Sequence, residues 1–269
     1  MFSLPWFIAG TALGAVSVLP ILIMRHNRDA TRTAEATNRA RASERMAEIG
    51  QMTSGLAHEI KNPLSTVGLN AQLLSEDIDH LDIDEVEKGR LTKRLETLSR
   101  EVERLRGILD DFLQFAGRMK LHRERTNLCE VLGELEDFYH PQCDSEHVVM
   151  RMELPSSPVF ANIDRSLLKQ AVLNLLINAT QALQGSDAKE LIVRLETNAT
   201  EALIHVIDTG PGIEQERIDE IFHPYVSNTQ GGSGLGLPTT MRIAQEHGGH
   251  ITVDSSLSNG SDFTVHIPL

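Results

Sequence analysis

Apolar and small residues recur in steps of three and four along two stretches of the N-terminal half, which is the spacing of an amphipathic α-helix. The first stretch contains Met46, Ile49, Thr53, Leu56, Ile60, Pro63, Val67 and Leu74, and the second contains Leu91, Leu95, Leu98, Val102, Leu105, Leu109, Phe112 and Ala116. We predict one helix that ends near Leu74, a turn over residues 75–84, and a second helix from Asp84 onward. The pattern predicts a helical hairpin over residues 49–118 that pairs with a second copy in a dimeric antiparallel four-helix bundle, because one chain cannot cover both apolar faces. An intramolecular helix pair packed on the C-terminal part is the alternative.

The C-terminal half changes to the alternation of apolar and polar residues that is typical of β-strands. Strands are predicted at Val148–Leu154, Ile192–Leu195, Ala202–Val206, Ile251–Val253 and Phe263–Ile267. Helix-period segments lie between them, and Asp164 stands where a helix N-cap is expected. Beyond a linker over residues 119–124, we therefore predict a two-layer α/β sandwich over residues 125–269.

The chain opens with an uncharged, mostly apolar segment, Leu4–Met24. As a helix rising about 1.5 Å per residue, it would cross a hydrocarbon core of about 30 Å. Arg25, His26 and Arg28 follow it directly, which favours a retained single-pass anchor over residues 1–28 with the remainder in the cytoplasm. A cleaved signal peptide is the alternative. Residues 29–48 are rich in Ala, Arg, Glu and Thr and are predicted to form a helical linker.

Composition narrows the classes of partner. The formal net charge is −13 and no long Lys/Arg stripe is present, which argues against general nucleic-acid binding. The two cysteines, Cys129 and Cys143, lack metal-ligand spacing and are predicted to be free thiols in a reducing compartment.

His58 lies off the apolar seam of the first helix. If Leu56 and Ile60 occupy heptad positions d and a, His58 takes position f, which is turned furthest toward water. An ordinary surface histidine would have the same placement. A neutral imidazole, whose unperturbed pKa is about 6.5, is also a competent nucleophile at cytoplasmic pH. Glu59 is placed to take or orient the proton on the other ring nitrogen, and Asn62 lies one helical turn further along the same face.

The segment His58–Pro63 resembles the H-box of sensor histidine kinases of two-component systems. The resemblance implies that His58 accepts the γ-phosphoryl group of ATP. It also implies that Asn62 positions the water that removes the phosphoryl group from a partner response regulator. The alternatives are a solvated helix face for Glu59 and Lys61, and a helix kink for Asn62 with Pro63.

Two asparagines lie one turn apart on the helix that follows Asp164. Asn174 and Asn178 interrupt an otherwise apolar helix, and we expect both to have partners because unpaired buried amides are costly. The surrounding residues resemble the N-box of the same kinases and of the wider ATPase superfamily that includes gyrase and heat-shock chaperones. The resemblance implies that Asn178 supplies an oxygen to Mg²⁺ and that Asn174 and Lys169 lie near the phosphates of ATP. Helix caps or satisfied core amides are the alternative for either asparagine alone.

A glycine turn ends one of the predicted strands. Asp208, Gly210 and Gly212 resemble the G1 box of the family, whose aspartate accepts a hydrogen bond from the adenine amino group. An ordinary strand-ending turn would look the same. An aspartic protease also carries Asp-Thr-Gly, but the neighbouring motifs do not belong to that class.

A second glycine run precedes a helix that is predicted to begin near Pro238. Glycines let backbone amides point into a concave phosphate site, and a helix N-terminus adds partial positive charge. The run resembles the G2 box of the family, which implies nucleotide contacts from Gly232, Gly234, Leu235 and Gly236.

The four motifs stand in family order over residues 48–269 and resemble most closely the kinases of the nitrogen-regulation type. Two positions depart from the family. Glu220 stands where relatives often carry an arginine, and Ser227-Asn228-Thr229 stands where they often carry Ser-Thr-Lys. The lid therefore lacks a cation for the γ-phosphate, and losing such a contact slows a reaction that depends on charge stabilisation.

Together these features predict a homodimeric sensor histidine kinase, anchored in the inner membrane of a bacterium with its catalytic part in the cytoplasm. It would autophosphorylate His58 from ATP with Mg²⁺, pass the phosphoryl group to a response regulator, and also support dephosphorylation of that regulator. The alternatives are a kinase-impaired phosphatase or scaffold, a conformational ATPase of the same superfamily, and a membrane-tethered helical adaptor without nucleotide chemistry.

Overall fold

The computed structural model describes residues 60–78, 80, 83–117, 119–226 and 232–269. The predicted membrane segment, the linker over residues 29–48, and the side chains of His58 and Glu59 lie outside these residues. Within the described ranges, no helix combines the length and the apolar character that a membrane crossing requires.

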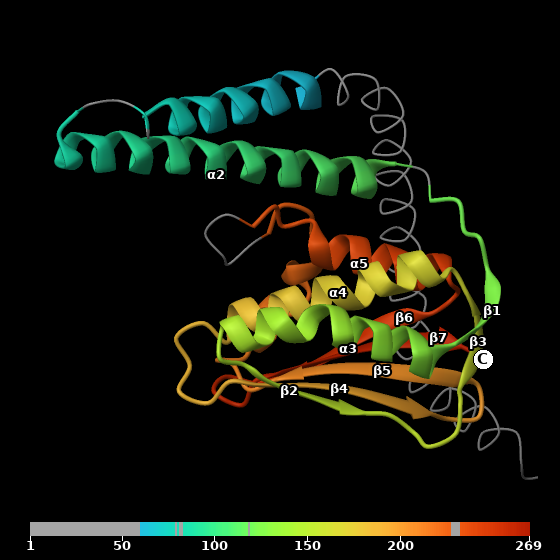
Figure 1. The fold of residues 1–269 in the computed structure, drawn as a ribbon. Coiled ribbons are helices and arrows are strands. Elements are labelled where there is room, and N and C mark those ends of the chain that lie inside the picture. The colour runs from blue at the N-terminus through green and yellow to red at the C-terminus, as the bar shows by residue number, and fades with distance from the viewer. Residues whose placement is uncertain (1–59, 79, 81–82, 118, 227–231) are drawn as a thin grey trace, which may run out of the picture.

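A helical hairpin forms the N-terminal part of the described structure. Residues 60–78 are helical and run beside α2 (Glu85–Ala116), as predicted from the two apolar stripes (Figure 1). The two helices approach closely where Gly68 faces Val102, because a Cβ added at Gly68 would lie 3.5 Å from Val102 Cγ1. Lys61 forms an ion pair with Asp110 of α2.

The first helix is longer than the apolar stripe predicted. It runs to residue 78, past the predicted end near Leu74 and into the segment predicted as a turn. Gln72 donates a hydrogen bond to Glu76 across one helical turn (3.2 Å), and the side chain of Ile78 is buried. These contacts support an extra turn of helix that the periodicity of the large apolar residues did not reveal.

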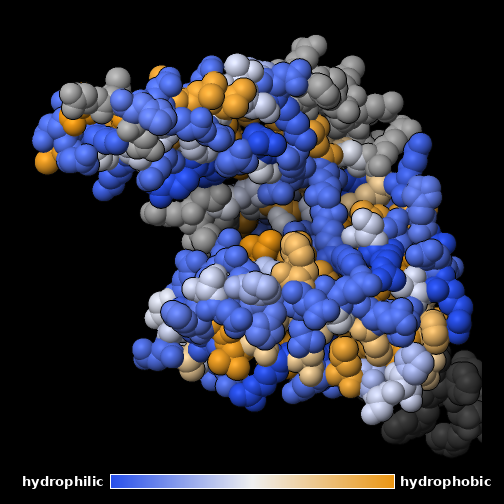
Figure 2. Space-filling model, in the orientation of Figure 1, coloured by the Kyte–Doolittle hydropathy of each residue, from blue (hydrophilic) through white to orange (hydrophobic). Residues whose placement is uncertain are grey.

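Part of both stripes stays exposed within one chain. Five of the predicted seam positions have exposed fractions between 42% and 51%, namely Ile60, Val67, Leu74, Leu98 and Leu105. Apolar side chains are visible on the outer side of the hairpin in the space-filling view (Figure 2). A contiguous apolar face of this kind is typical of a surface that a second helical hairpin covers.

The C-terminal part is the predicted two-layer sandwich, built on a five-stranded sheet of order β2-β4-β5-β7-β6. Its strands are β2 (Val149–Glu153), β4 (Glu190–Thr197), β5 (Glu201–Asp208), β6 (His250–Ser255) and β7 (Ser261–Pro268). The pair β2–β4 is parallel and the other pairs are antiparallel. Each strand coincides with a predicted one, with ends that differ by one or two residues.

Three helices cover one face of this sheet: α3 (Leu128–Ser145), α4 (Arg165–Ala182) and α5 (Gly236–Glu246) (Figure 1). The alternating residues of β5 that face the helices, such as Ile204 and Val206, are fully buried with Leu168 and Leu175 of α4. The Asp164 side chain caps α4 as predicted, because its carboxylate accepts hydrogen bonds from the backbone amides of Ser166 and Leu167, both at 3.1 Å. The cap and the apolar face of α4 together fix this helix against the sheet.

Two short strands were not predicted. β1 (Glu124–Asn127) and β3 (Phe160–Ile163) form a separate antiparallel pair. β1 has the sequence Glu-Arg-Thr-Asn, so no apolar alternation marks it. Two 3₁₀ turns, η1 (Gln215–Arg217) and η2 (Glu220–Phe222), connect β5 toward the glycine run.

Candidate nucleotide-binding site

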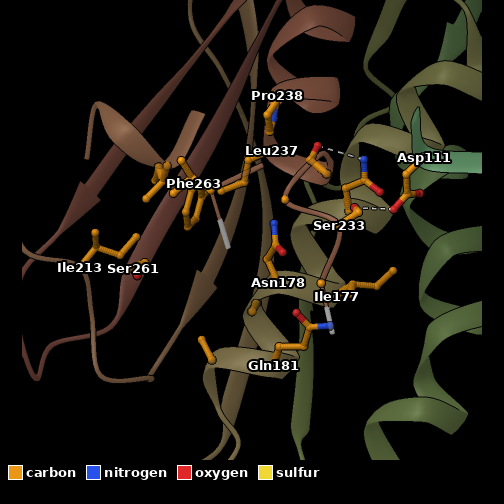
Figure 3. Close-up of a pocket in the computed structure, with 18 of the residues that line it drawn as sticks. Asp111, Ile177, Asn178, Gln181, Ile213, Ser233, Leu237, Pro238, Ser261 and Phe263 are labelled. Atoms are coloured by element: carbon orange, nitrogen blue, oxygen red, sulfur yellow. Dashed lines mark hydrogen bonds between the residues drawn. The ribbon is translucent and has the colours of Figure 1, made fainter. Parts of the chain in front are cut away.

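A cavity of about 640 Å³ lies between α4, the turn after β5, the glycine run and the C-terminal half of α2. It brings together side chains from segments far apart in the sequence, and Figure 3 shows them converging on one space. The predicted site residues among its walls are Asn174, Asn178, Asp208, Gly212, Gly232, Gly234 and Gly236. Seven of the predicted nucleotide contacts therefore share one cavity.

Helix α4 presents its two asparagines to this cavity. Asn174 has the expected partners, because its amide nitrogen donates to the Gly236 carbonyl oxygen at 3.2 Å and lies 3.4 Å from the Thr240 hydroxyl. The amide nitrogen of Asn178 is buried and makes no hydrogen bond, contrary to the expectation for both. A buried amide without a partner at the edge of a polar cavity is suited to a ligand that completes its bonding. The terminal amide also offers an oxygen, the ligand atom that Mg²⁺ prefers.

The turn after β5 holds a buried carboxylate. The Asp208 side chain is 3% exposed and accepts a hydrogen bond from the backbone amide of Gly210 at 2.8 Å. Burial raises the pKa of the Asp208 carboxyl above its usual value, and hydrogen bonds from Gly210 and Ser261 offset only part of that rise. Gly212 follows with a φ of 74°, and a Cβ there would lie 2.1 Å from the Ser256 carbonyl oxygen, so the turn requires glycine. Gly210 itself is outside the cavity wall and acts by orienting Asp208.

The glycine run forms the opposite wall. Gly234 has a φ of 67°, and a Cβ at this position would lie 2.7 Å from the Tyr225 carbonyl carbon. Leu235 is almost fully buried and does not line the cavity. α5 begins at Gly236, two residues before the predicted start. Its N-terminus therefore adjoins the cavity, where exposed amides favour an anion.

Helix α2 supplies a wall that the motifs did not predict. Arg104, Gly107, Ile108 and Asp111 line the cavity from this helix. The Ser233 hydroxyl donates to the Asp111 carboxylate at 2.6 Å, as the dashed line in Figure 3 marks. A second contact joins α2 to α5, since Arg242 of α5 donates to the backbone carbonyl of Phe115. The helical hairpin therefore contacts the glycine run directly.

Arg104 is the only cationic side chain among the residues that line the cavity, as far as the described parts of the chain extend. Its guanidinium lies 2.7 Å from the Glu101 carboxylate, and the side chain is 44% exposed. An exposed pair of this kind is weak, so the guanidinium is available to a stronger anion. Arg104 is not part of the apolar stripe of the second helix, and no signal in the sequence connected it with the nucleotide motifs.

Lys169 lies outside the cavity, although the N-box resemblance places it near the phosphates. Its ammonium group forms an ion pair with Glu134 of α3, which Arg165 also contacts. These two partners lower the pKa of the Glu134 carboxyl. Five residues on a helix correspond to a rotation of about 140° beyond a full turn, so Lys169 and Asn174 face different sides of α4.

The H-box is described only in part. Asn62 is exposed on the first helix, and its backbone carbonyl accepts a hydrogen bond from the Thr66 hydroxyl at 3.1 Å. Lys61, one residue earlier, pairs with Asp110, the neighbour of Asp111 in the cavity wall. The segment that follows His58 in sequence is thus held against the part of α2 that borders the cavity.

A buried carboxylate, an asparagine amide and a glycine run at a helix N-terminus are the features expected of a nucleotide-binding site of the histidine kinase, gyrase and chaperone class. Comparison of the sequence with family models agrees with this class of protein. Residues 163–269 match the histidine kinase-, DNA gyrase B-, and HSP90-like ATPase model, and residues 48–118 match the His Kinase A (phospho-acceptor) domain. The two matches cover more than half of the chain, which belongs to the family of two-component sensor histidine kinases.

Known proteins of this family resemble nearly the whole chain. It is 27% identical over 261 residues to the sensor histidine kinase ZraS of Klebsiella oxytoca, covering 97% of this chain and 54% of that protein. It is 29% identical over 241 residues to the signal transduction histidine-protein kinase AtoS of Escherichia coli K12, covering 90% of this chain and 38% of that protein. The chain therefore spans about half, or less, of the length of these relatives.

Solved structures show the same arrangement of elements. Full-length ShkA in complex with AMPPNP has a TM-score of 0.67 at 22% identity, over 81% of this chain and 45% of that one, which establishes likeness of fold. The histidine kinase ThkA in complex with the response regulator protein TrrA has a TM-score of 0.59 at 27% identity, over 84% of this chain and 63% of that one.

Proposed function

We propose that this chain is the kinase core of a sensor histidine kinase that transfers the γ-phosphoryl group of ATP to His58. One observation carries the proposal: the cavity that gathers Asn178, Asp208 and the glycine run is closed on one side by the phosphoacceptor hairpin. Such an arrangement brings a nucleotide and the helical hairpin into contact within one protein.

Each residue has a role in this proposal. The Asp208 carboxylate accepts a hydrogen bond from the adenine amino group, while the amides of the glycine run and the guanidinium of Arg104 contact the phosphates. Asn178 would hold Mg²⁺ through its amide oxygen, and the ion would neutralise charge on the phosphates. Arg104 takes the place that Lys169 has in the N-box resemblance and compensates for the lid sequence, which has no Lys or Arg over residues 227–231.

The transfer follows from nucleophilic catalysis by histidine. A ring nitrogen of His58 forms a bond to the γ-phosphorus, the bond to the bridging oxygen breaks in line with it, and ADP leaves with that electron pair. Glu59 orients, or takes, the proton on the other ring nitrogen. A receiver-domain aspartate of a separate response regulator then accepts the phosphoryl group, and Asn62 supports its later removal by water.

We further propose a homodimer, formed through the exposed apolar seam of the hairpin, and an anchor in the bacterial inner membrane through residues 1–28. The dimer is supported by the exposed seam positions and by the match to the phospho-acceptor domain. The complex of ThkA with TrrA supports a response regulator as partner. The relatives ZraS and AtoS are a sensor histidine kinase and a signal transduction histidine-protein kinase, which supports a signalling role for this chain.

A second candidate is a phosphatase or scaffold with weak kinase activity, which the cation-free lid sequence favours. The two are separated by incubating the chain with γ-labelled ATP and Mg²⁺, and separately with a phosphorylated receiver domain. Incorporation of label supports the kinase. ATP binding without label, together with loss of phosphate from the receiver that Asn62→Ala abolishes, supports the phosphatase. An Asn62→Ala variant that dephosphorylates the receiver normally would remove Asn62 from the proposal.

A further inference from the structure

We propose that Glu201, His250 and His266 form a binding site for a divalent transition-metal ion such as Zn²⁺. The three residues come from three neighbouring strands of the large sheet, β5, β6 and β7. His250 and His266 are directly opposite in the β6–β7 register, and His266 is opposite Leu203, two residues from Glu201. Alternation along β5 buries Ala202 and Ile204 toward the helices, so Glu201 points to the opposite face of the sheet.

The spacing of the donor atoms suits one small ion. One ligand atom from each residue can be chosen so that all three lie within 4.8 Å of one another. His266 Nδ1 lies 3.5 Å from Glu201 Oε2, and the two imidazole rings have centroids 4.0 Å apart. Tetrahedral ligands at about 2.0–2.2 Å from Zn²⁺ lie about 3.3–3.6 Å from one another. The Glu201–His266 pair already has this separation. The rings of His250 and His266 are stacked with an angle of 16° between their planes, so the exposed His250 has to turn out of the stack for its ring nitrogen to reach the same ion.

Hydrogen bonding prepares His266 as a ligand. Its Nε2 lies 2.9 Å from the Thr252 hydroxyl, which can accept the proton of that nitrogen. In a neutral imidazole with Nε2 protonated, Nδ1 carries a free lone pair. Nδ1 is buried and makes no hydrogen bond, although it faces the Glu201 carboxylate. Two acceptors that face each other in this way require a cation between them, either a proton on Nδ1 or a metal ion.

The donor set selects the class of metal. Two imidazole nitrogens and one carboxylate favour Zn²⁺, Ni²⁺ or Cu²⁺ over Mg²⁺, which prefers oxygen ligands. A hydrogen bond from a ligating imidazole to a neighbouring oxygen, as the Nε2-protonated form of His266 can make with Thr252, is the usual support for such a ligand. None of the three residues lines the nucleotide cavity, so the metal site is independent of the proposed kinase activity.

The test is a calorimetric titration of the full chain, without a histidine tag and stripped of metal, with Zn²⁺ in excess Mg²⁺. We expect one Zn²⁺ per chain at this site, and an affinity at least about 10-fold weaker in Glu201→Gln and in His250→Gln. Thr252→Val, which removes the supporting hydroxyl but no ligand, should weaken binding by about 10-fold. His140→Gln is the matched control, because His140 is a half-exposed histidine on α3 that pairs with Asp144 instead.

Thermal unfolding without metal verifies that each variant is folded. Because His250 is exposed, the His250→Gln variant is expected to unfold at the wild-type temperature. Co²⁺ added in place of Zn²⁺ should give the visible absorption of a low-coordinate site in the wild type and lose it in both ligand variants. Absence of Zn²⁺ binding, or equal binding by the wild type and the folded ligand variants, would overturn the proposal and leave Glu201 and His266 as an ion pair.

Discussion

Replacing Asp208 by Asn separates the cost of a buried charge from its use in nucleotide recognition. The carboxylate is 3% exposed, and burial raises its pKa in the folded protein. Because the pKa is raised, the contribution of this carboxyl to stability is complete below its pKa in the unfolded chain, about 3.9. That contribution is lost as pH rises through its pKa in the folded protein. Asn keeps an oxygen for the Gly210 amide and removes the charge. At neutral pH the variant should therefore unfold at the same temperature as the wild type or higher.

Nucleotide binding should change in the opposite direction. A hydrogen bond to a charged group is worth about 1.5–3 kcal/mol, so its loss weakens ATP binding about 10- to 150-fold. Calorimetry with ATP and with ITP, which has an oxygen in place of the adenine amino group, isolates the contact. The wild type should prefer ATP, while Asp208→Asn, whose amide can donate to that oxygen, should lose the preference. Equal losses of affinity for ATP and for ITP, or unchanged ATP binding in a folded variant, would refute the assignment of Asp208 to adenine.

Substitutions at three further residues test other parts of the site and fold. Arg104→Gln should weaken the binding of ATP more than that of ADP, with a Kd for ATP about 3- to 10-fold higher, because it removes a cationic side chain from the cavity wall. Arg100 lies one turn away and is bonded within its own helix, so Arg100→Gln should leave the binding of both nucleotides unchanged. Asp164→Ala should destabilise the protein by about 0.5–2 kcal/mol in urea unfolding, since it removes the cap of α4. Burial alone would raise the pKa of the Asp164 carboxyl, but hydrogen bonds from backbone amides outweigh it and lower the pKa in the folded protein. The carboxylate therefore stabilises the fold above about pH 3.9, and this contribution is lost as pH falls through the pKa of the folded state. Asp164→Asn should abolish this dependence on pH. Gly212→Ala should lower the unfolding temperature, because its Cβ would lie 2.1 Å from a backbone oxygen, whereas Gly133→Ala, with no atom within 4 Å, should not.

Local chemistry made some elements predictable. A single acidic residue before an apolar helix marked the Asp164 cap, and strict alternation marked β5 because one of its faces is buried and the other is not. Asp208 was found because its strand-ending glycine turn resembles the G1 box of the family, since the turn alone is a weak signal. In each case the determining interactions lie within a few residues in the sequence.

Other elements depend on contacts between distant segments. β1 is too short and polar to show a pattern, and it exists because β3 pairs with it. Arg104 lines the cavity because contacts such as that of Asp111 with Ser233, more than one hundred residues later, hold α2 against the glycine run. Lys169 was placed near the phosphates by the N-box resemblance, whereas its direction around α4 turns it to Glu134. The pairing of β1 and the positions of Arg104 and Lys169 therefore depend on packing between segments that are distant in the sequence.

The central claim is that nucleotide bound in this cavity phosphorylates His58. The most direct measurement is the incorporation of label from γ-labelled ATP and Mg²⁺ into the chain, with the acid and alkali stability of the label recorded for the wild type, His58→Gln and Asp208→Asn. The account predicts an acid-labile, alkali-stable label that is absent from His58→Gln and reduced at low ATP concentration in Asp208→Asn. Label of the same stability in His58→Gln, or no label in a wild-type chain that binds ATP, would contradict it.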